Sequence, residues 1–299
     1  MDDLDSTSLM DDLDVRLLVD LLRDRIRPDR SLGQHFLLDE AVIARAVELA
    51  GTDSPITAAS HCLEIGPGPG SLTLELLRTG ARVTALEVDA EATAHLGRVF
   101  GTANGRLSVQ QIDALQVDWP TDISHIVSNF PFQISSPVLE RIQKHHARNP
   151  LAGIVLLVQD EFAERMAMKG GNASRGPLGH SLWLQFDIEL DLRVSPSAFS
   201  PAPRVTSRLV ALKPATRENT DQIDERLFRL VISSCFANRR RKLRTTLKRP
   251  PRRLNRINGW HKERWTRGIE RLEPALLDLR PENLTSEDWA SLIGKISLE

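Results

Sequence analysis

The sequence predicts an α/β protein whose mostly parallel sheet is covered by helices on both faces, followed by a small helical domain. Between residues 61 and 158, short apolar runs typical of buried strands alternate with stretches of helical periodicity. Such alternation produces a parallel sheet with helices on its two faces. After Pro214 the strand-like runs end, and the chain becomes helical and basic. We therefore expect an extension over 1–30, an α/β domain over 31–214 and a helical domain over 215–299.

The first 30 residues form an acidic extension, with nine Asp, no Glu and five Arg. Apolar residues at helical spacing predict an amphipathic helix over residues 12–26 that packs on the main domain. The expected apolar face consists of Leu17, Leu18, Leu21, Leu22 and Ile26. An acidic start is unlike a secretory or organellar targeting segment, and no apolar run reaches the length of a membrane span. These observations predict a cytoplasmic protein that does not bind membranes.

The elements of the α/β domain follow one another in a regular order. Expected strands cover 62–65, 82–88, 107–110, 123–127 and 154–158, and expected helices cover 71–79 and 90–99. The β-rich runs 188–194 and 205–212 break this rhythm. A proline-rich loop joins them, so we expect an antiparallel hairpin that closes one edge of the sheet.

A Gly-Pro-Gly-Pro-Gly turn at residues 66–70 follows the first of these strands, where open α/β sheets bind ligands. Glu87 ends the next strand, 21 residues after Gly66, and a carboxylate there can accept hydrogen bonds from ribose hydroxyls. The turn lacks the spacing that holds a pyrophosphate, and Pro67 and Pro69 remove backbone donors. S-adenosylmethionine, an adenosine cofactor without phosphate, fits better. Asp113 is a candidate acceptor for the adenine amine, or alternatively a loop cap.

Residues 129–132 read Asn-Phe-Pro-Phe and follow the apolar run 123–127. The amide oxygen of Asn129 and nearby carbonyls can accept hydrogen bonds from an exocyclic amine. The ring of Phe132 can stack on a base, a contact worth roughly 1–3 kcal/mol in single-strand binders. The alternative is a strand end followed by a proline turn. Together with the glycine turn upstream, the tetrapeptide predicts a site for a planar base.

Charge is distributed unevenly along the chain. The net charge is −1, but residues 236–271 contain fourteen Lys or Arg and two Glu. This run predicts a surface that binds a polyanion, the alternative being a solvated helix face. The expected RNA-binding side chains are Arg239, Arg240, Arg241, Lys242, Arg244 and Lys248. The two cysteines, Cys62 and Cys235, are expected to be reduced core thiols, and no metal-ligand spacing occurs.

The ordered set of motifs resembles that of the small-subunit ribosomal RNA adenine dimethyltransferases, the KsgA family. The similarity extends from about Ser31 to Leu292. The segments that carry it are 32–37, 64–70, 86–89, 113–115, 129–137, 159–161 with Arg165, 198–207, 236–242 and 280–284. The glycine turn alone is common to many nucleotide sites, whereas the whole ordered set is specific.

The resemblance implies a Rossmann-like class I methyltransferase that uses S-adenosylmethionine. It implies dimethylation of two adjacent adenosines near the 3′ end of small-subunit rRNA, by a monomer that binds the pre-small ribosomal subunit during ribosome biogenesis. The implied cofactor contacts are His35, Leu37, Gly66, Glu87, Asp113 and Asn129. The implied catalytic pocket consists of Asn129, Phe130, Pro131 and Phe132. Phe199 is expected either to form the opposite wall of the base site or to anchor its loop.

Three positions depart from the family pattern. Phe132 stands where Tyr is usual, His35 where bacterial members carry Asn, and Ile112 where Gly is common. None removes a group that the chemistry requires. Two other functions stay open: a methyltransferase acting on another RNA, such as large-subunit rRNA, and an RNA-binding ribosome-assembly factor with secondary catalysis.

Overall fold

The computed structural model of this 299-residue chain describes residues 13–24, 34–218, 220 and 223–298. The chain divides into two compact units, one made of residues 1–163 and 189–214 and the other of 164–188 and 215–299. One division therefore falls directly after Pro214. The segment 164–188, which the sequence does not separate from the α/β domain, belongs to the second unit. The assignment of domains by function stays a prediction.

The first unit is built around a seven-stranded sheet in the order β4-β3-β2-β5-β6-β9-β7. Its strands are β2 His61–Ile65, β3 Arg82–Glu87, β4 Leu107–Gln111, β5 His125–Ser128, β6 Gly153–Gln159, β7 Phe186–Val194 and β9 Ser207–Pro214. The strands from β4 to β6 pair in parallel, and β9 pairs antiparallel with β6. The predicted α/β fold is confirmed, with β9 and β7 closing one edge of the sheet.

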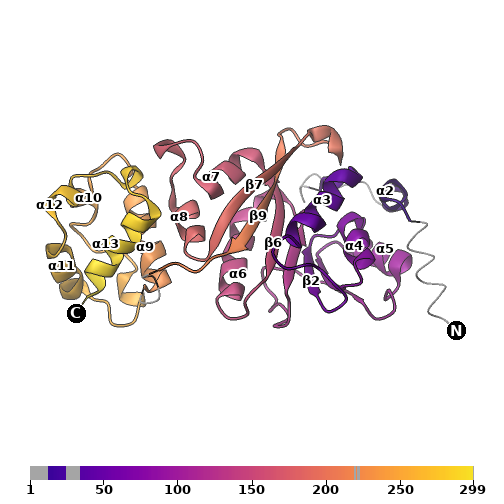
Figure 1. Ribbon diagram of the computed structural model, residues 1–299, viewed down its shortest axis with the longest axis horizontal. Coiled ribbons are helices and arrows are strands. Elements are labelled where there is room, and N and C mark those ends of the chain that lie inside the picture. Colours follow the sequence, from indigo (N-terminus) through magenta and orange to yellow (C-terminus); the bar gives the residue numbers. More distant parts are fainter. Residues whose placement is uncertain (1–12, 25–33, 219, 221–222, 299) are drawn as a thin grey trace. The chain divides into compact units, whose positions relative to one another are not determined.

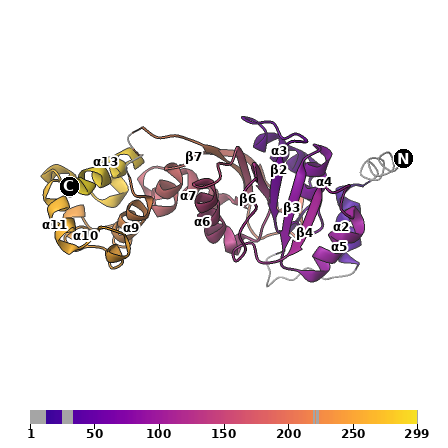
Figure 2. The same ribbon diagram turned by 90° about the horizontal axis from the view of Figure 1, so that it is seen from below.

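Helices cover both faces of this sheet (Figures 1 and 2). On one face lie α3 Glu40–Ala50, α4 Ser71–Arg78 and α5 Ala90–Phe100, and on the other lies α6 Ser135–His146. Side chains alternate across a strand, so Cys62, Val83 and Ala85 all point into the core beneath the first three helices. Because β2, β3, β4 and β5 pair in parallel, their carboxyl ends lie along one edge of the sheet.

Helix α2, Val15–Arg23, packs on the first unit as expected, but its buried face differs from the predicted one. Asp14 caps it by accepting a hydrogen bond from the backbone N–H of Leu17 at 2.7 Å. The buried residues are Val15, Leu18, Val19 and Leu22, whereas Leu17 and Leu21 are 42% and 39% exposed. These four buried residues follow the i, i+3, i+4, i+7 spacing of one helix face. The predicted face omitted the two valines and was therefore rotated around the helix. Ile26 and the remainder of the acidic extension, 1–12 and 25–30, lie outside the described residues.

A two-stranded sheet, which the sequence does not predict, joins β1 Phe36–Leu37 to β8 Phe199–Ser200. The strands are antiparallel, with Leu37 opposite Phe199, and the backbone N–H of Leu38 donates to the carbonyl of Ala198. Two-residue strands carry too little periodicity to be recognised. This pairing fixes the backbone of residues 36–38.

The second unit is helical. Its helices are α8 Pro177–Trp183, α9 Glu225–Phe236, α10 Leu243–Thr246, α11 Lys262–Glu270, α12 Pro274–Leu277 and α13 Ser286–Ser297, while α7 Asp160–Ala167 extends across the division. Short 3₁₀ helices in this unit are η3 Asn172–Ser174, η5 Leu254–Arg256 and η6 Pro281–Asn283, while η2 Phe132–Ile134 and η4 Pro196–Ala198 belong to the first unit. The core holds Phe228, Trp265 and Trp289. A hydrogen bond of 2.8 Å joins Nδ1 of His180 on α8 to Oγ of Ser286 on α13. This bond connects the segment 164–188 to the rest of the unit.

Both cysteines are buried free thiols, and burial raises the pKa of each to about 12. Such thiols stay protonated, as expected for reduced core residues. In the described part of the chain, no helix is both long and apolar enough to span a membrane.

Candidate active site

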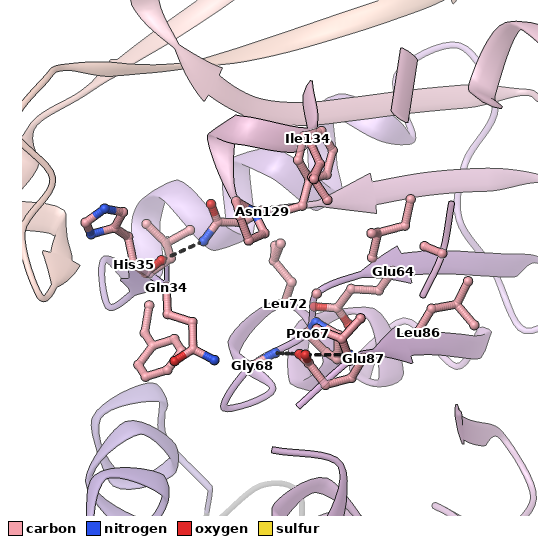
Figure 3. A pocket seen from close by; sticks show the side chains of 18 of the residues that line it. Gln34, His35, Glu64, Pro67, Gly68, Leu72, Leu86, Glu87, Asn129 and Ile134 are labelled. Atoms are coloured by element: carbon pink, nitrogen blue, oxygen red, sulfur yellow. Dashed lines mark hydrogen bonds between the residues drawn. The ribbon is translucent and has the colours of Figure 1, made fainter. Parts of the chain in front are cut away.

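A cavity of about 260 Å³ lies at the carboxyl ends of the parallel strands (Figure 3). Its lining consists of residues 34–37, 64–69, 71–72, 86–88, 112–115 and 129–134. The six residues predicted to contact the cofactor are all in this lining, as are the four residues of the Asn-Phe-Pro-Phe motif. The fold therefore places the predicted cofactor contacts and the Asn-Phe-Pro-Phe motif around the same cavity.

The glycine turn is held by side chains of the protein itself. A Cβ atom placed on Gly68 would lie 3.1 Å from the ring of Phe36. At Gly70, where φ is +92°, it would lie 2.6 Å from Phe100 and 2.8 Å from Leu96. Glycine at these positions thus serves close packing by Phe36 and α5, as well as an approach by ligand.

Glu87 joins the glycine turn to the end of β3. Its buried carboxylate accepts backbone N–H bonds from Gly68 at 3.1 Å, Val88 at 2.8 Å and Asp89 at 2.9 Å. Burial raises the pKa of Glu87, and the three N–H bonds lower it in part. A carboxylate offers about four acceptor positions. The backbone fills three of them, which leaves one acceptor position on Oε2, and the predicted role of Glu87 as a ribose acceptor requires such a position.

Glu64 is a second buried carboxyl group in the lining, with 1% of its surface exposed. The hydroxyl of Thr73 donates to Glu64 Oε2 at 2.5 Å. Burial raises the pKa of Glu64 to about 8, the Thr73 bond opposes the shift, and the charge of Glu87 adds to it. At neutral pH the carboxyl therefore keeps its proton for much of the time when no cation is nearby.

The raised pKa of Glu64 predicts a pH-dependent stability of the cofactor-free protein. The folded state favours protonated Glu64, so this contribution is complete below the ordinary value near 4.5 and is lost as the pH rises through about 8. The free energy of unfolding should fall by a few kcal/mol over that range, since each pKa unit corresponds to about 1.4 kcal/mol. Glu64→Gln should remove this slope in denaturant titrations between pH 5 and 8. The control Glu75→Gln, on helix α4 with Thr73, should retain the slope. Equal slopes in all three proteins would contradict the assignment.

Asp113 caps its own loop and also lines the cavity. Its carboxylate accepts from the backbone N–H of Leu115 at 2.8 Å and from the Gln116 amide at 2.9 Å. Trp119 anchors the same loop by donating from Nε1 to the carbonyl of Ala114 at 2.9 Å, with Arg141 stacked 5.4 Å from the Trp119 ring centre. Both sequence interpretations of Asp113 are therefore compatible with its position, and the Trp119 anchor is a contact that the sequence does not suggest.

The side-chain amide of Asn129 is oriented by the backbone (Figure 3). Its Nδ2 donates to the carbonyl of His35 at 3.1 Å. A carbonyl can only accept, so this bond fixes which end of the amide is nitrogen. The amide oxygen of Asn129 therefore points away from His35 and is available to accept.

Phe132 lies beside the ring of His35, with centroids 6.1 Å apart and an interplanar angle of 27°. His35 Nδ1 lies 2.8 Å from the carbonyl of Pro201, which makes Nδ1 the protonated nitrogen. Phe130, by contrast, is only 2% exposed, although it belongs to the lining. His35 thus holds Asn129 through its carbonyl and packs against Phe132 through its ring.

Phe199 lies outside the cavity lining. Its ring is 4% exposed and belongs to the core beneath α3, while its backbone pairs with Leu37. This arrangement favours the alternative role, an anchor of its loop, over a wall of the base site. The anchoring is useful to the site because it holds residues 35–37 in place.

The chemistry of the lining fits S-adenosylmethionine. Among the described residues that line the cavity none is Lys or Arg, whereas Glu64, Glu87 and Asp113 are acidic. This lining has no cation to attract a phosphate, but its carboxylates can attract the positively charged sulfonium and amino groups of S-adenosylmethionine. Val88 and Ile112 are exposed apolar side chains at the ends of β3 and β4, and they offer flat contacts to an adenine ring.

The predicted RNA-binding side chains belong to the second unit and differ in their partners. Arg239 pairs with Glu282 at 3.0 Å and donates to the carbonyl of Ala173 at 3.2 Å. Lys242 and Arg244 both pair with the carboxylate of Asp278. The remaining three, Arg240, Arg241 and Lys248, are exposed and have no carboxylate partner within the described ranges. Sequence alone does not reveal that three of the six side chains form ion pairs with Glu282 or Asp278.

The fold and the site define a class of protein. A mostly parallel sheet with helices on both faces, a glycine turn after its first parallel strand and an acidic cavity at the strand ends are the features of an S-adenosylmethionine-dependent methyltransferase. The helical second unit contributes no residue to that cavity among those described.

Comparison with known proteins gives the family. The sequence model "Ribosomal RNA adenine dimethylase" matches residues 26–258, and the chain belongs to this family. A probable ribosomal RNA small subunit methyltransferase A from Haloarcula marismortui is 38% identical over 89% of each chain. The ribosomal RNA small subunit methyltransferase A of Magnetococcus marinus is 37% identical, covering 75% of this chain and 80% of its own.

Solved structures agree on the fold. A dimethyladenosine transferase from Plasmodium falciparum superimposes with a TM-score of 0.72 at 24% identity, over 86% of this chain and 95% of its own. The 23S rRNA methyltransferase ErmE superimposes with a TM-score of 0.62 at 21% identity, over 88% of this chain and 99% of its own. The family match and the curated relatives confirm the predicted family, enzyme class and cofactor, and the solved structures confirm the fold.

Proposed function

We propose that this protein transfers two methyl groups to the exocyclic amine of each of two adjacent adenosines near the 3′ end of small-subunit rRNA. It does so in the cytoplasm, as a monomer bound to the pre-small ribosomal subunit. The observation that carries the proposal is the orientation of Asn129, whose amide oxygen is left free to accept by the bond to His35. The names of the curated relatives support the choice of the small subunit.

The chain's contribution to the reaction is chiefly one of positioning. An adenine amine is a weak nucleophile because its lone pair is delocalised into the ring. Hydrogen bonds from the amine to Asn129 and a neighbouring carbonyl localise the lone pair and aim it, while Phe132 holds the ring plane. The bound cofactor supplies an electrophilic methyl group. After transfer the amine nitrogen is positively charged, so its proton is acidic and leaves to water.

The position of Asn129 restricts the substrate. Asn129 and Phe132 lie at the carboxyl ends of the strands, on a cavity lining where both are only half-buried. A base paired in a duplex cannot present its amine there, so the target adenosine must be unpaired or flipped out. The second transfer requires that the same space admit the monomethylated amine.

A single experiment tests the proposed function. The protein is incubated with methyl-labelled S-adenosylmethionine and immature small subunits, and the modified nucleosides are mapped. We expect dimethyladenosine at two adjacent positions near the 3′ end. Label only in large-subunit rRNA would indicate another RNA target. Tight binding of the subunit without label would indicate an assembly factor.

RNA binding by the second unit can be tested through its salt dependence. Arg240→Gln with Arg241→Gln should weaken rRNA binding and flatten the log–log salt slope by roughly 0.7–0.9 for each lost phosphate contact. The matched control is Lys242→Gln with Arg244→Gln, which removes the same charge from side chains already paired with Asp278. The control should change the slope less, and cofactor affinity should be unchanged in both. Equal slopes in the parent and the Arg240/Arg241 variant would place the RNA surface elsewhere.

A further inference from the structure

Helix α2 packs against Phe36, and Phe36 lines the cofactor cavity. Val19 and Leu22 on α2 form a small apolar cluster with Phe36 and Ala92. All four side chains are buried, with Leu22 wholly covered. This cluster is separate from the main core, to which Val15 and Leu18 of the same helix belong. The two ends of α2 thus pack on different parts of the first unit.

Phe36 is the point at which this cluster reaches the site. It lines the cavity, and its ring lies against Gly68, whose Cβ position is only 3.1 Å from Phe36 Cε1. Gly68 is in turn the residue whose N–H donates to Glu87. A displaced Phe36 ring would leave the glycine turn uncovered on that side and free to change its bond to the carboxylate.

The other member of the cluster, Ala92, lies in the first turn of α5. That turn is capped by Asp89, whose carboxylate accepts from the backbone N–H groups of Glu91 and Ala92 and from the amide of Gln34 at 3.1 Å. Gln34 also lines the cavity. The cluster therefore holds the 34–37 segment and the start of α5 together.

We propose that α2 is a positioning element of the cofactor pocket, acting through the contact of Val19 and Leu22 with Phe36. The helix preorganises the glycine turn, so S-adenosylmethionine does not have to order it on binding. Rigidifying a site in its bound conformation raises affinity by removing an ordering cost. The acidic extension, of which α2 is the described part, is accordingly required for full cofactor affinity.

Calorimetry on the full-length protein tests this role. Val19→Ala with Leu22→Ala should weaken the binding of S-adenosylhomocysteine by about tenfold, which is 1.4 kcal/mol. The matched control on the exposed face, Leu17→Ala with Leu21→Ala, should bind as the parent does. Parental affinity in the Val19/Leu22 variant would overturn the proposal.

A second control separates positioning from stability. Leu18 is as fully buried as Leu22 but packs into the main core, so Leu18→Ala should destabilise the fold to a similar extent without the loss of affinity. An equal loss of affinity in Leu18→Ala would show that destabilisation of the fold, and not the contact with Phe36, lowers cofactor affinity. The proposed role of that contact would then be wrong.

Hydrogen exchange gives an independent readout. Coupling between two sites is reciprocal, so if α2 favours cofactor binding then the bound cofactor must stabilise α2. Saturation with S-adenosylhomocysteine should slow the exchange of the amides of residues 18–24 in the parent, and this protection should be absent in the Val19/Leu22 variant. Unchanged exchange in the parent would also overturn the proposal, since a helix that only packs on the fold has no such link.

Discussion

Asn129→Ala is expected to lower the rate of methyl transfer by at least about a hundredfold, comparable with the loss of an oriented hydrogen bond at a reacting centre. The alanine variant has no acceptor for the adenine amine, so the lone pair stays delocalised and is no longer aimed. The rate is measured under single-turnover conditions with immature small subunits and saturating cofactor. Binding of the subunit should change little, because we expect its phosphates to contact the basic side chains of the second unit.

Two measurements distinguish this outcome from misfolding. The variant also frees the carbonyl of His35, which Asn129 Nδ2 satisfies in the parent. We therefore expect a small loss of thermal stability, together with measurable cofactor binding in calorimetry. Parental turnover in a well-folded Asn129→Ala protein would mean that another group accepts the amine, and the proposed mechanism would be wrong.

The centre of the sheet could be predicted from the sequence because strands β2, β3, β5 and β6 are buried on both faces. A continuous apolar run as short as 154–158, bounded by turn residues, is typical of a strand in a covered parallel sheet. The predicted strand at 123–127 starts two residues before β5, His125–Ser128, and ends one residue before it. His125 is polar in sequence, but its ring is buried and bonded to Ser54 and Ser124, so a polar residue belongs to the strand.

The site could be predicted only where local chemistry is distinctive. The glycine turn and Asn129 are recognisable because residues of these types at strand ends are typical of ligand sites. The partners that orient them are distant in sequence: His35 reaches Asn129, and Phe36 reaches Gly68. Likewise, the pairing of Arg239 with Glu282 depends on how the second unit folds. Such contacts leave no local pattern in the sequence. The sequence therefore predicts more unpaired basic side chains than the structure has, and it does not predict the hydrogen bond from Asn129 to the carbonyl of His35.

The other large effect is expected at Glu87. Glu87→Ala should weaken S-adenosylmethionine binding by roughly 1–3 kcal/mol, about five- to 150-fold, the cost of leaving buried polar groups unpaired. The substitution removes the ribose acceptor and also leaves the N–H groups of Gly68, Val88 and Asp89 without their carboxylate. Calorimetry with the cofactor and with S-adenosylhomocysteine should show the same loss, since the two share the ribose.

The control for charge is Glu91→Ala, an exposed carboxylate one turn further along, in the first turn of α5. It changes the net charge equally but accepts no hydrogen bond from the glycine turn, so cofactor affinity should remain at the parental value. Glu87→Gln refines the result, because its amide keeps one acceptor oxygen but turns a donor toward either Gly68 or Val88 and Asp89. Its affinity should fall between the parent and Glu87→Ala. Unchanged affinity in Glu87→Ala would show that the ribose does not bind at the end of β3. The proposed orientation of the cofactor would then be wrong.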